Sequence, residues 1–189
     1  MDYFCVDVET SGPTPGLHNL LSIGVTHVSG RDAFEPKADL YVELRPTFPG
    51  FDERAMAVHG LDRGRLAREG LEPAEAMRKI AGWVASQRLE PADRPVCVAH
   101  NAPFDWMFLA FHFGHAGLDN PFGFAALDTK ALAMGVLGLP WAETTLKTVS
   151  RLVRAPHPDP RQLHHAGADA RHTARVFSAL MNRRARGLE

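Results

Sequence analysis

The chain has 189 residues, of which 45% are hydrophobic and 23% charged, and its formal net charge is −1. This composition excludes a disordered or collagen-like chain, and the small net charge excludes a protein driven onto a polyanion by overall charge alone. Neither a membrane-length apolar run nor a signal-peptide pattern is present. Two cysteines, Cys5 and Cys97, lie within apolar runs. We therefore expect a cytoplasmic protein with no membrane association, no disulfide scaffold and one domain over residues 1–189.

The first part of the chain predicts three strands, at residues 3–8, 20–28 and 39–44. The first is rich in β-branched and aromatic residues and stops at a loop rich in glycine and proline, and the other two show partial or clear alternation of apolar and polar residues. The short connections between them are typical of an antiparallel meander.

The remainder of the chain alternates predicted helices and strands. Helices are expected at residues 52–58, 72–87, 102–115, 129–136, 145–153 and 166–184, and strands at residues 95–99 and 124–127. The closing helix carries one apolar stripe, formed by Ala170, Ala174, Phe177 and Met181. Three strands followed by alternating helices and strands predict the α/β class, with helices on the faces of a mixed sheet.

Charge is distributed unevenly along the chain. Residues 147–186 include nine basic and two acidic side chains, whereas residues 1–60 include four basic and nine acidic ones. The basic segment is either an ordinary solvated helix face or a rim that attracts phosphate beside an acidic pocket, and charge alone does not decide between the two.

Two carboxylates close together mark the end of the first predicted strand. Asp7 and Glu9 are two positions apart, so their side chains point to the same face of the strand. The two acids repel each other and are poor core residues unless a cation neutralises them, and hard oxygen ligands suit Mg²⁺ or Mn²⁺. A solvent-facing strand end with two unpartnered acids is the simpler alternative.

Two further acids fall in the first turns of predicted helices. Asp105 follows the short apolar strand at residues 95–99, and Asp169 follows His164 in a segment rich in alanine and glycine. Stabilisation of the helix N-terminus is sufficient to explain either acid alone. However, the neighbours of Asp105 are strongly apolar, so this acid needs a partner, and the small residues around Asp169 allow its helix to approach another element closely.

Together these segments resemble one known family. Residues 7–12 (DVETSG), residues 98–105 (VAHNAPFD) and the pattern His164-x-Ala166-x-x-Asp169 resemble the three exonuclease motifs of the DEDD 3′–5′ exonuclease superfamily. The histidine in the third motif is typical of the DnaQ-like (DEDDh) branch. Weaker similarities at residues 57–61, 127–129 and 173–177 extend the resemblance over nearly the whole chain.

The resemblance implies an RNase H-like α/β fold, with a five-stranded mixed sheet whose first three strands are antiparallel. It also implies that four carboxylates hold two divalent cations, Mg²⁺ or Mn²⁺, and that His164 takes the proton from the attacking water; the four acids are Asp7, Glu9, Asp105 and Asp169. Contacts to the terminal nucleotide are expected from the backbone near Val8 and from Thr10, Met56, His59 and Phe104.

The expected reaction is metal-dependent removal of nucleoside 5′-monophosphates from the 3′ end of single-stranded DNA or RNA. A metal-dependent nucleotide phosphohydrolase and a non-catalytic nucleic-acid-binding module of the same fold are the alternatives, and a histidine-based zinc enzyme has the least support. The sequence leaves open whether DNA or RNA is the substrate, and whether a polymerase complex or a homodimer is formed.

Overall fold

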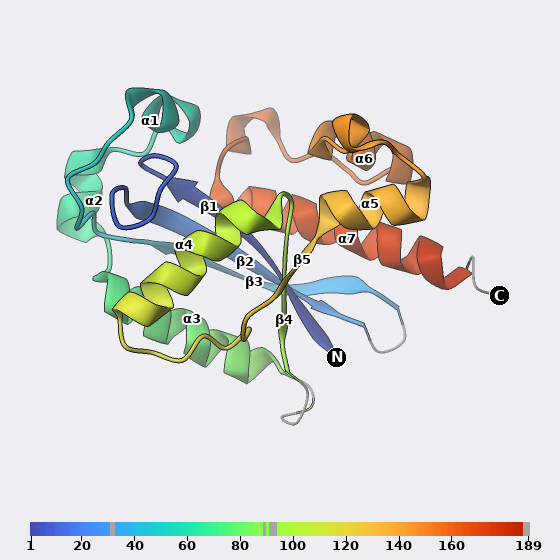
Figure 1. The fold of residues 1–189 in the computed structure, drawn as a ribbon, viewed down its shortest axis with the longest axis horizontal. Helices are drawn as coiled ribbons and strands as arrows, with labels where there is room; N and C mark the ends of the chain where they lie inside the picture. Colours follow the sequence, from blue (N-terminus) through green and yellow to red (C-terminus); the bar gives the residue numbers. More distant parts are fainter. Residues whose placement is uncertain (31–32, 89, 91–93, 187–189) are drawn as a thin grey trace.

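The computed structural model describes residues 1–30, 33–88, 90 and 94–186, and its centre is a five-stranded sheet (Figure 1). The strands are Asp2–Thr10 (β1), Leu20–Ser29 (β2), Glu35–Glu43 (β3), Val96–Ala99 (β4) and Ala126–Asp128 (β5), and they lie in the order β3-β2-β1-β4-β5. The first three strands pair antiparallel, and β4 and β5 run parallel to β1. The predicted mixed sheet is therefore confirmed.

Every strand differs from its predicted bounds by at least one residue, and β3 and β5 are the two whose start is displaced most. β3 was predicted at residues 39–44 and begins earlier, at Glu35. β3 lies at an edge of the sheet, where a proline such as Pro36 is tolerated. Its first half is mostly exposed, so the sequence there lacks the alternation of apolar and polar residues that marks a strand. β5 was predicted at residues 124–127 and is displaced to Ala126–Asp128. The apolar Phe124 suggested a strand, but its side chain is 97% exposed in the preceding turn.

The helices are Glu53–His59 (α1), Arg63–Glu69 (α2), Pro73–Gln87 (α3), Ala102–His115 (α4), Thr129–Leu137 (α5), Leu146–Val153 (α6) and Ala166–Arg186 (α7). Short 3₁₀ turns lie at Trp141–Glu143 and Pro160–Gln162. All except α2 and the 3₁₀ turns were predicted; α2 buries a single residue, Leu66, and so has almost no apolar stripe. Within the described part of the chain, no helix has the length and hydrophobicity needed to cross a bilayer.

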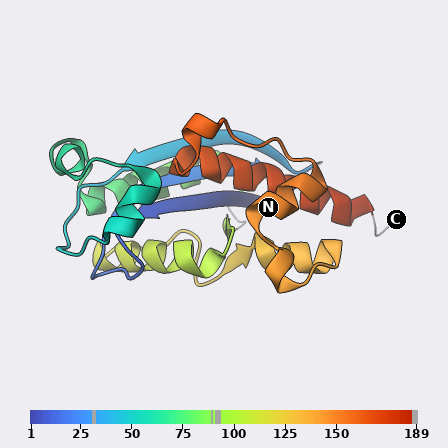
Figure 2. The same cartoon turned by 90° about the horizontal axis from the view of Figure 1, so that it is seen from above.

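The sheet separates two helical layers, and Figure 2 shows α4 and α7 on opposite sides of β1. On one face Val6 and Val8 pack in a core that includes Phe108 of α4 and Ile80 of α3. On the other face Cys5 packs with side chains of α7. The residues predicted to form the α7 stripe, Ala170, Ala174, Phe177 and Met181, are all buried, which confirms that prediction.

The beginning of α7 lies directly against the backbone of β2. A Cβ atom added to Gly24 would lie 2.1 Å from the carbonyl oxygen of Ala166, a distance that no side chain tolerates. The glycine therefore permits a close approach that a larger residue would prevent. This contact sets the position of the first turn of α7, where Asp169 lies.

Candidate active site

Asp7 and Glu9 lie at the end of β1 on the face that α7 covers. Side chains alternate along a strand, and Val6 and Val8 point into the core beneath α3 and α4. The odd-numbered positions therefore face the other way, as Cys5 does in its contact with α7. Glu9 is only 8% exposed. The structure thus places both acids side by side on one face of the sheet, as their spacing predicts.

Asp105 joins the second motif to the first. It lies in the first turn of α4, is 5% exposed, and its Oδ1 accepts a hydrogen bond of 3.1 Å from the backbone N–H of Val8. The loop before α4 is held by Asp128, whose Oδ1 accepts from the N–H groups of Asn101 (3.0 Å) and Lys130 (2.9 Å). Asn101 has a φ of 68°, a left-handed conformation that asparagine tolerates well. The neighbourhood of Asp105 is therefore fixed by backbone contacts.

Asp169 and His164 complete the cluster from the third motif. Glu9, His164 and Asp169 each offer a ligand atom, and these three atoms lie within 4.8 Å of one another. His164 lies in the turn before α7 with a φ of 59°, which confirms the expectation that it precedes the helix. The carbonyl of His165 accepts the N–H groups of Ala168 (2.8 Å) and Asp169 (3.0 Å), and this fixes the first turn of α7.

The four acids retain protons more strongly than isolated carboxyls do. Burial, and then repulsion from Asp105, Glu9 and Asp169, holds the pKa of Asp7 well above its usual range. Burial is also the main cause that raises the pKa of Glu9 to about 8 and that of Asp105 to about 8. The pKa of Asp169 is raised, chiefly by burial. Without a cation, the cluster therefore favours protonated acids near neutral pH.

This donor set fits divalent cations. Carboxylate oxygens are hard ligands, and an imidazole nitrogen is a common addition. A bound cation compensates the burial and the repulsion that raise the pKa values of Asp7 and Glu9. Three of the five predicted residues, Glu9, His164 and Asp169, have their ligand atoms close enough together to bind one metal ion. Asp7 and Asp105 belong to the same cluster through electrostatic repulsion rather than through that group. The residues present therefore match a divalent-metal site in their chemistry.

Two of the predicted substrate-contact residues, Thr10 and His59, are joined to each other. The backbone N–H of Leu61 donates to Nδ1 of His59 (3.1 Å), so the ring proton lies on Nε2 and is directed at the carbonyl of Thr10 (3.3 Å). Burial lowers the pKa of His59, which favours this neutral ring. The Thr10 hydroxyl donates to the carbonyl of Gly12 (2.9 Å), so its lone pairs remain as acceptors.

Of the other three predicted contact residues, Met56 and Phe104 have partly exposed side chains, whereas the side chain of Val8 is buried. Met56 is half-buried on α1, and Phe104 is half-buried at the start of α4, where its ring lies 5.4 Å from that of Phe108. The side chain of Val8 is buried in the core, and its N–H is already bonded to Asp105. Val8 therefore fixes an acid rather than offering a free backbone N–H.

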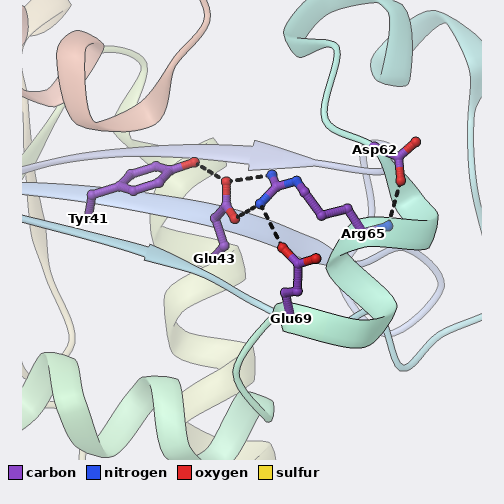
Figure 3. A network of polar contacts seen from close by, with 5 residues as sticks. All are labelled: Tyr41, Glu43, Asp62, Arg65 and Glu69. Carbon is purple, nitrogen blue, oxygen red and sulfur yellow. Dashed lines mark hydrogen bonds and ion pairs between the residues drawn. The ribbon is translucent and has the colours of Figure 1, made fainter.

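A polar network between β3 and α2 was not anticipated from the sequence (Figure 3). The hydroxyl of Tyr41 donates to Oε1 of Glu43 (2.9 Å), and Arg65 of α2 donates to both oxygens of Glu43 (2.5 and 2.8 Å). The ring of Tyr41 also stacks with that of His165, with centroids 4.3 Å apart. Only contacts between distant residues reveal this network, because no local pattern in the sequence marks it.

No family model matches the chain. The chain is, however, similar in sequence to curated proteins that are named exonucleases and ribonucleases. It is 39% identical to the 3′–5′ DNA exonuclease Cap18 of Escherichia coli over 93% of this chain and 89% of the relative. It is 34% identical to ribonuclease T of Yersinia enterocolitica over 94% of this chain and 83% of the relative.

Solved structures share the fold. The nuclease domain of 3′hExo, a DEDDh family member bound to rAMP, superposes with a TM-score of 0.80 over 95% of this chain and 91% of its own, at 13% identity. Exonuclease I of E. coli, in complex with a dT13 oligonucleotide, superposes with a TM-score of 0.75 at 16% identity over 99% of this chain. The chain spans 42% of exonuclease I. These similarities establish the RNase H-like fold of DEDDh nucleases.

Proposed function

The chain belongs to the DnaQ-like (DEDDh) 3′–5′ exonuclease family, and from this premise we propose how its own residues carry out the reaction. It is a phosphodiester hydrolase that removes nucleotides from a 3′ end. The observation that carries the proposal is the convergence of Glu9, His164 and Asp169, whose ligand atoms lie within 4.8 Å of one another. Asp105, held by the N–H of Val8, and Asp7 supply the remaining acids.

Asp7, Glu9, Asp105 and Asp169 would hold two divalent cations, Mg²⁺ or Mn²⁺, and the repulsion among these acids favours cation binding. When bound, the cations supply Lewis acidity that activates a water and stabilises the charge developing on the phosphate. A ring nitrogen of His164 accepts the proton of the attacking water. The bond between phosphorus and the leaving 3′ oxygen breaks, and a nucleoside 5′-monophosphate is released.

The terminal nucleotide would lie beside Thr10, His59, Met56 and Phe104. Lone pairs of the Thr10 hydroxyl are available to accept from the terminal 3′ hydroxyl. The half-buried side chains of Met56 and Phe104 offer apolar surface to a base, as aromatic side chains do in single-strand binding. A paired end has to be melted before its last nucleotide enters such a site, so we propose a single-stranded substrate.

Domain organisation, cellular compartment and partners are part of the same proposal. We take residues 1–189 as one exonuclease domain, and the two cysteines, which are free and buried, suit a reducing cytoplasm. A polymerase complex and a homodimer remain predictions. The non-catalytic module has no support from the intact set of four acids and one histidine. The nucleotide phosphohydrolase is less favoured because the similar proteins are named exonucleases and ribonucleases.

A degradation assay tests this function directly. We expect 5′-labelled single-stranded DNA or RNA to shorten stepwise from the 3′ end with Mg²⁺ or Mn²⁺, and a mononucleotide to appear as product. EDTA should abolish the reaction, and Asp7→Asn should reduce it by roughly 10²–10⁴-fold, since several kcal/mol of metal-derived stabilisation is lost. A folded Asp7→Asn variant with near wild-type turnover would show that the metal-site assignment is wrong.

A further inference from the structure

A groove of about 450 Å³ lies between the edge strand β3 and the first half of α7. Its lining includes Tyr41 and Asp39 of β3, Gln162 of the 3₁₀ turn, and His165, Arg171 and Arg175. Asp159 also lines it and is paired with Arg161. The lining residue His165 directly follows His164, so the groove adjoins the catalytic cluster. It shares no residue with the proposed terminal-nucleotide contacts, which come from β1, α1 and α4.

One wall of the groove is an aromatic stack. The ring of His165 is exposed and lies on the ring of Tyr41 at an interplanar angle of 27°. The hydroxyl of Tyr41 donates a hydrogen bond to Glu43, and Arg65 fixes Glu43 through two further hydrogen bonds (Figure 3). A Cβ atom at Gly167 would lie 3.2 Å from Cε1 of His165, so the glycine leaves room beside this ring. The stack is therefore a supported, accessible, planar surface.

The opposite part of the groove carries positive charge from α7. Arg171 forms an ion pair with Asp39, so much of its charge is neutralised. Arg175 is half-buried and forms no ion pair with any residue that the structure describes. It therefore offers an uncompensated guanidinium, a group well suited to phosphate. An exposed aromatic surface beside such a cation is the combination with which proteins bind single-stranded nucleic acid.

We propose that this groove is a subsite for the strand on the leaving-group side of the scissile phosphate. A base stacks on His165, and a backbone phosphate lies at Arg175. The inference rests on the proposed function, because it assigns a place to the part of the substrate that remains after the terminal nucleotide is removed. It also gives a function to part of the basic C-terminal segment, as a rim that binds phosphate rather than a solvated face.

The test compares a polynucleotide with a substrate that lacks a strand. The first is single-stranded DNA about ten nucleotides long, within the range that one binding site covers. The second is the p-nitrophenyl ester of thymidine 5′-monophosphate, whose leaving group is not a nucleotide. The measured quantity is the ratio of kcat/KM for the strand to kcat/KM for the ester. This ratio isolates contacts on the leaving-group side from the chemistry at the acids.

We expect Arg175→Gln and His165→Ala each to lower this ratio by roughly tenfold, the size of one stacking or phosphate contact. His165→Phe should retain the ratio, because it keeps an aromatic ring on Tyr41. The salt dependence of strand binding should weaken by about 0.7 in the log–log slope for Arg175→Gln. Arg183→Gln is the matched control: it removes the same charge from an exposed position on the same helix and should leave the ratio unchanged.

The outcomes separate this inference from the proposed function. If the wild-type protein with Mg²⁺ or Mn²⁺ cleaves neither substrate, the proposed function fails. If it cleaves both, but Arg175→Gln and His165→Ala leave the ratio as Arg183→Gln does, the subsite is refuted. A His165→Ala variant that loses the ester and the strand equally would place His165 in the chemistry instead.

Discussion

The backbone N–H of Val8 donates a hydrogen bond of 3.1 Å to Oδ1 of Asp105, which lies 97 residues later in the chain. Through this bond the first and second motifs hold each other in place without any metal. The acid of α4 is fixed against the strand that carries Asp7 and Glu9. One consequence is that the proposed role of Asp105 in metal binding and its role in the fold can be separated by substitution.

Asp105→Asn should abolish most activity and leave the fold intact. The amide oxygen of asparagine still accepts from the N–H of Val8, whereas the negative charge offered to a cation is lost. We expect turnover to fall roughly 10²–10⁴-fold, the equivalent of several kcal/mol of transition-state stabilisation. Turnover on single-stranded DNA and thermal unfolding in EDTA are the two measurements.

In EDTA, the unfolding temperature of Asp105→Asn should equal or exceed that of the wild type, because one of several repelling acids is gone. The exposed Asp119 provides the control: Asp119→Asn should change neither quantity. An Asp105→Asn variant that unfolds in buffer would mean that the charge itself supports the fold, contrary to this reasoning.

The metal-free protein should lose stability as the pH rises above neutral. Glu9 and Asp105 have pKa values of about 8 in the folded state, above the usual carboxyl range, and burial is the main cause. An acid whose pKa is raised by folding stabilises the fold fully below its unfolded-state pKa. This contribution declines as the pH rises above that value and is gone once the pH has passed the folded-state pKa. The free energy of unfolding should therefore fall by on the order of 2 kcal/mol for each of these two acids between about pH 6.5 and 8.5.

This pH window avoids opposite contributions from buried histidines. His100 and His172 have pKa values lowered to about 4, chiefly by burial, so they destabilise the fold only below about pH 6.5. The measurement is denaturant unfolding in EDTA across the window, repeated with Mg²⁺, which should remove most of the slope. The variant Glu9→Gln should flatten it as well. A metal-free protein that gains stability from pH 6.5 to 8.5 would contradict the assigned acid environment.

Much of the sheet is predictable because burial leaves a periodic pattern in the sequence. β1, β2 and α7 are covered on at least one face, so their apolar residues repeat at the spacing of a strand or helix. β3 lies at an edge and is mostly exposed along its first half, so its start is not marked. α2 was missed for the same reason, since only Leu66 is buried there.

The site is predictable to a different extent. The motifs name the acids, and alternation in β1 places Asp7 and Glu9 on one face. The bond from Val8 to Asp105 and the stack of Tyr41 on His165 depend on strand register and on helix position across the sheet. No local pattern encodes such contacts, so the sequence predicts which residues react but not which residues hold them.

Gly24→Ala should impair the enzyme although Gly24 belongs to none of the three motifs. Its Cβ would lie 2.1 Å from the carbonyl oxygen of Ala166, and a backbone atom cannot rotate away. The start of α7 would have to move, and with it Asp169 and His164. We expect a loss of about 1–3 kcal/mol in the free energy of unfolding, and a clear loss of turnover.

The same substitution at Gly82 is the matched control. Gly82 lies within α3, and a Cβ there would meet no atom within 4 Å. Gly82→Ala should therefore leave activity unchanged and raise stability by about 0.5–1 kcal/mol, because alanine favours the helix. Chemical denaturation and turnover measure both variants. Equal behaviour of the two would show that the contact between β2 and α7 tolerates a side chain.

Two adjacent histidines should differ sharply in the chemical step. A ring nitrogen of His164 lies within 4.8 Å of ligand atoms of Glu9 and Asp169, whereas the ring of His165 stacks on Tyr41. His164 also has a φ of 59°, so an alanine there adds backbone strain, and asparagine, which tolerates this conformation, is the cleaner replacement. We expect His164→Asn to lower turnover roughly 10²–10⁴-fold, the usual range for a lost general base.

The decisive measurement is turnover of the p-nitrophenyl ester at saturating Mn²⁺, with metal affinity measured separately by calorimetry. His164→Asn should lose turnover while it still binds metal, because four acids remain. His165→Ala should lose far less on this substrate, since its ring stacks on Tyr41 and lines the groove, and it is His164 that joins Glu9 and Asp169. If metal binding disappears together with turnover in His164→Asn, the histidine acts as a ligand and not as the base. If His165→Ala, and not His164→Asn, loses turnover, the assignment of the two residues is reversed. If neither variant loses turnover, water activation does not depend on histidine.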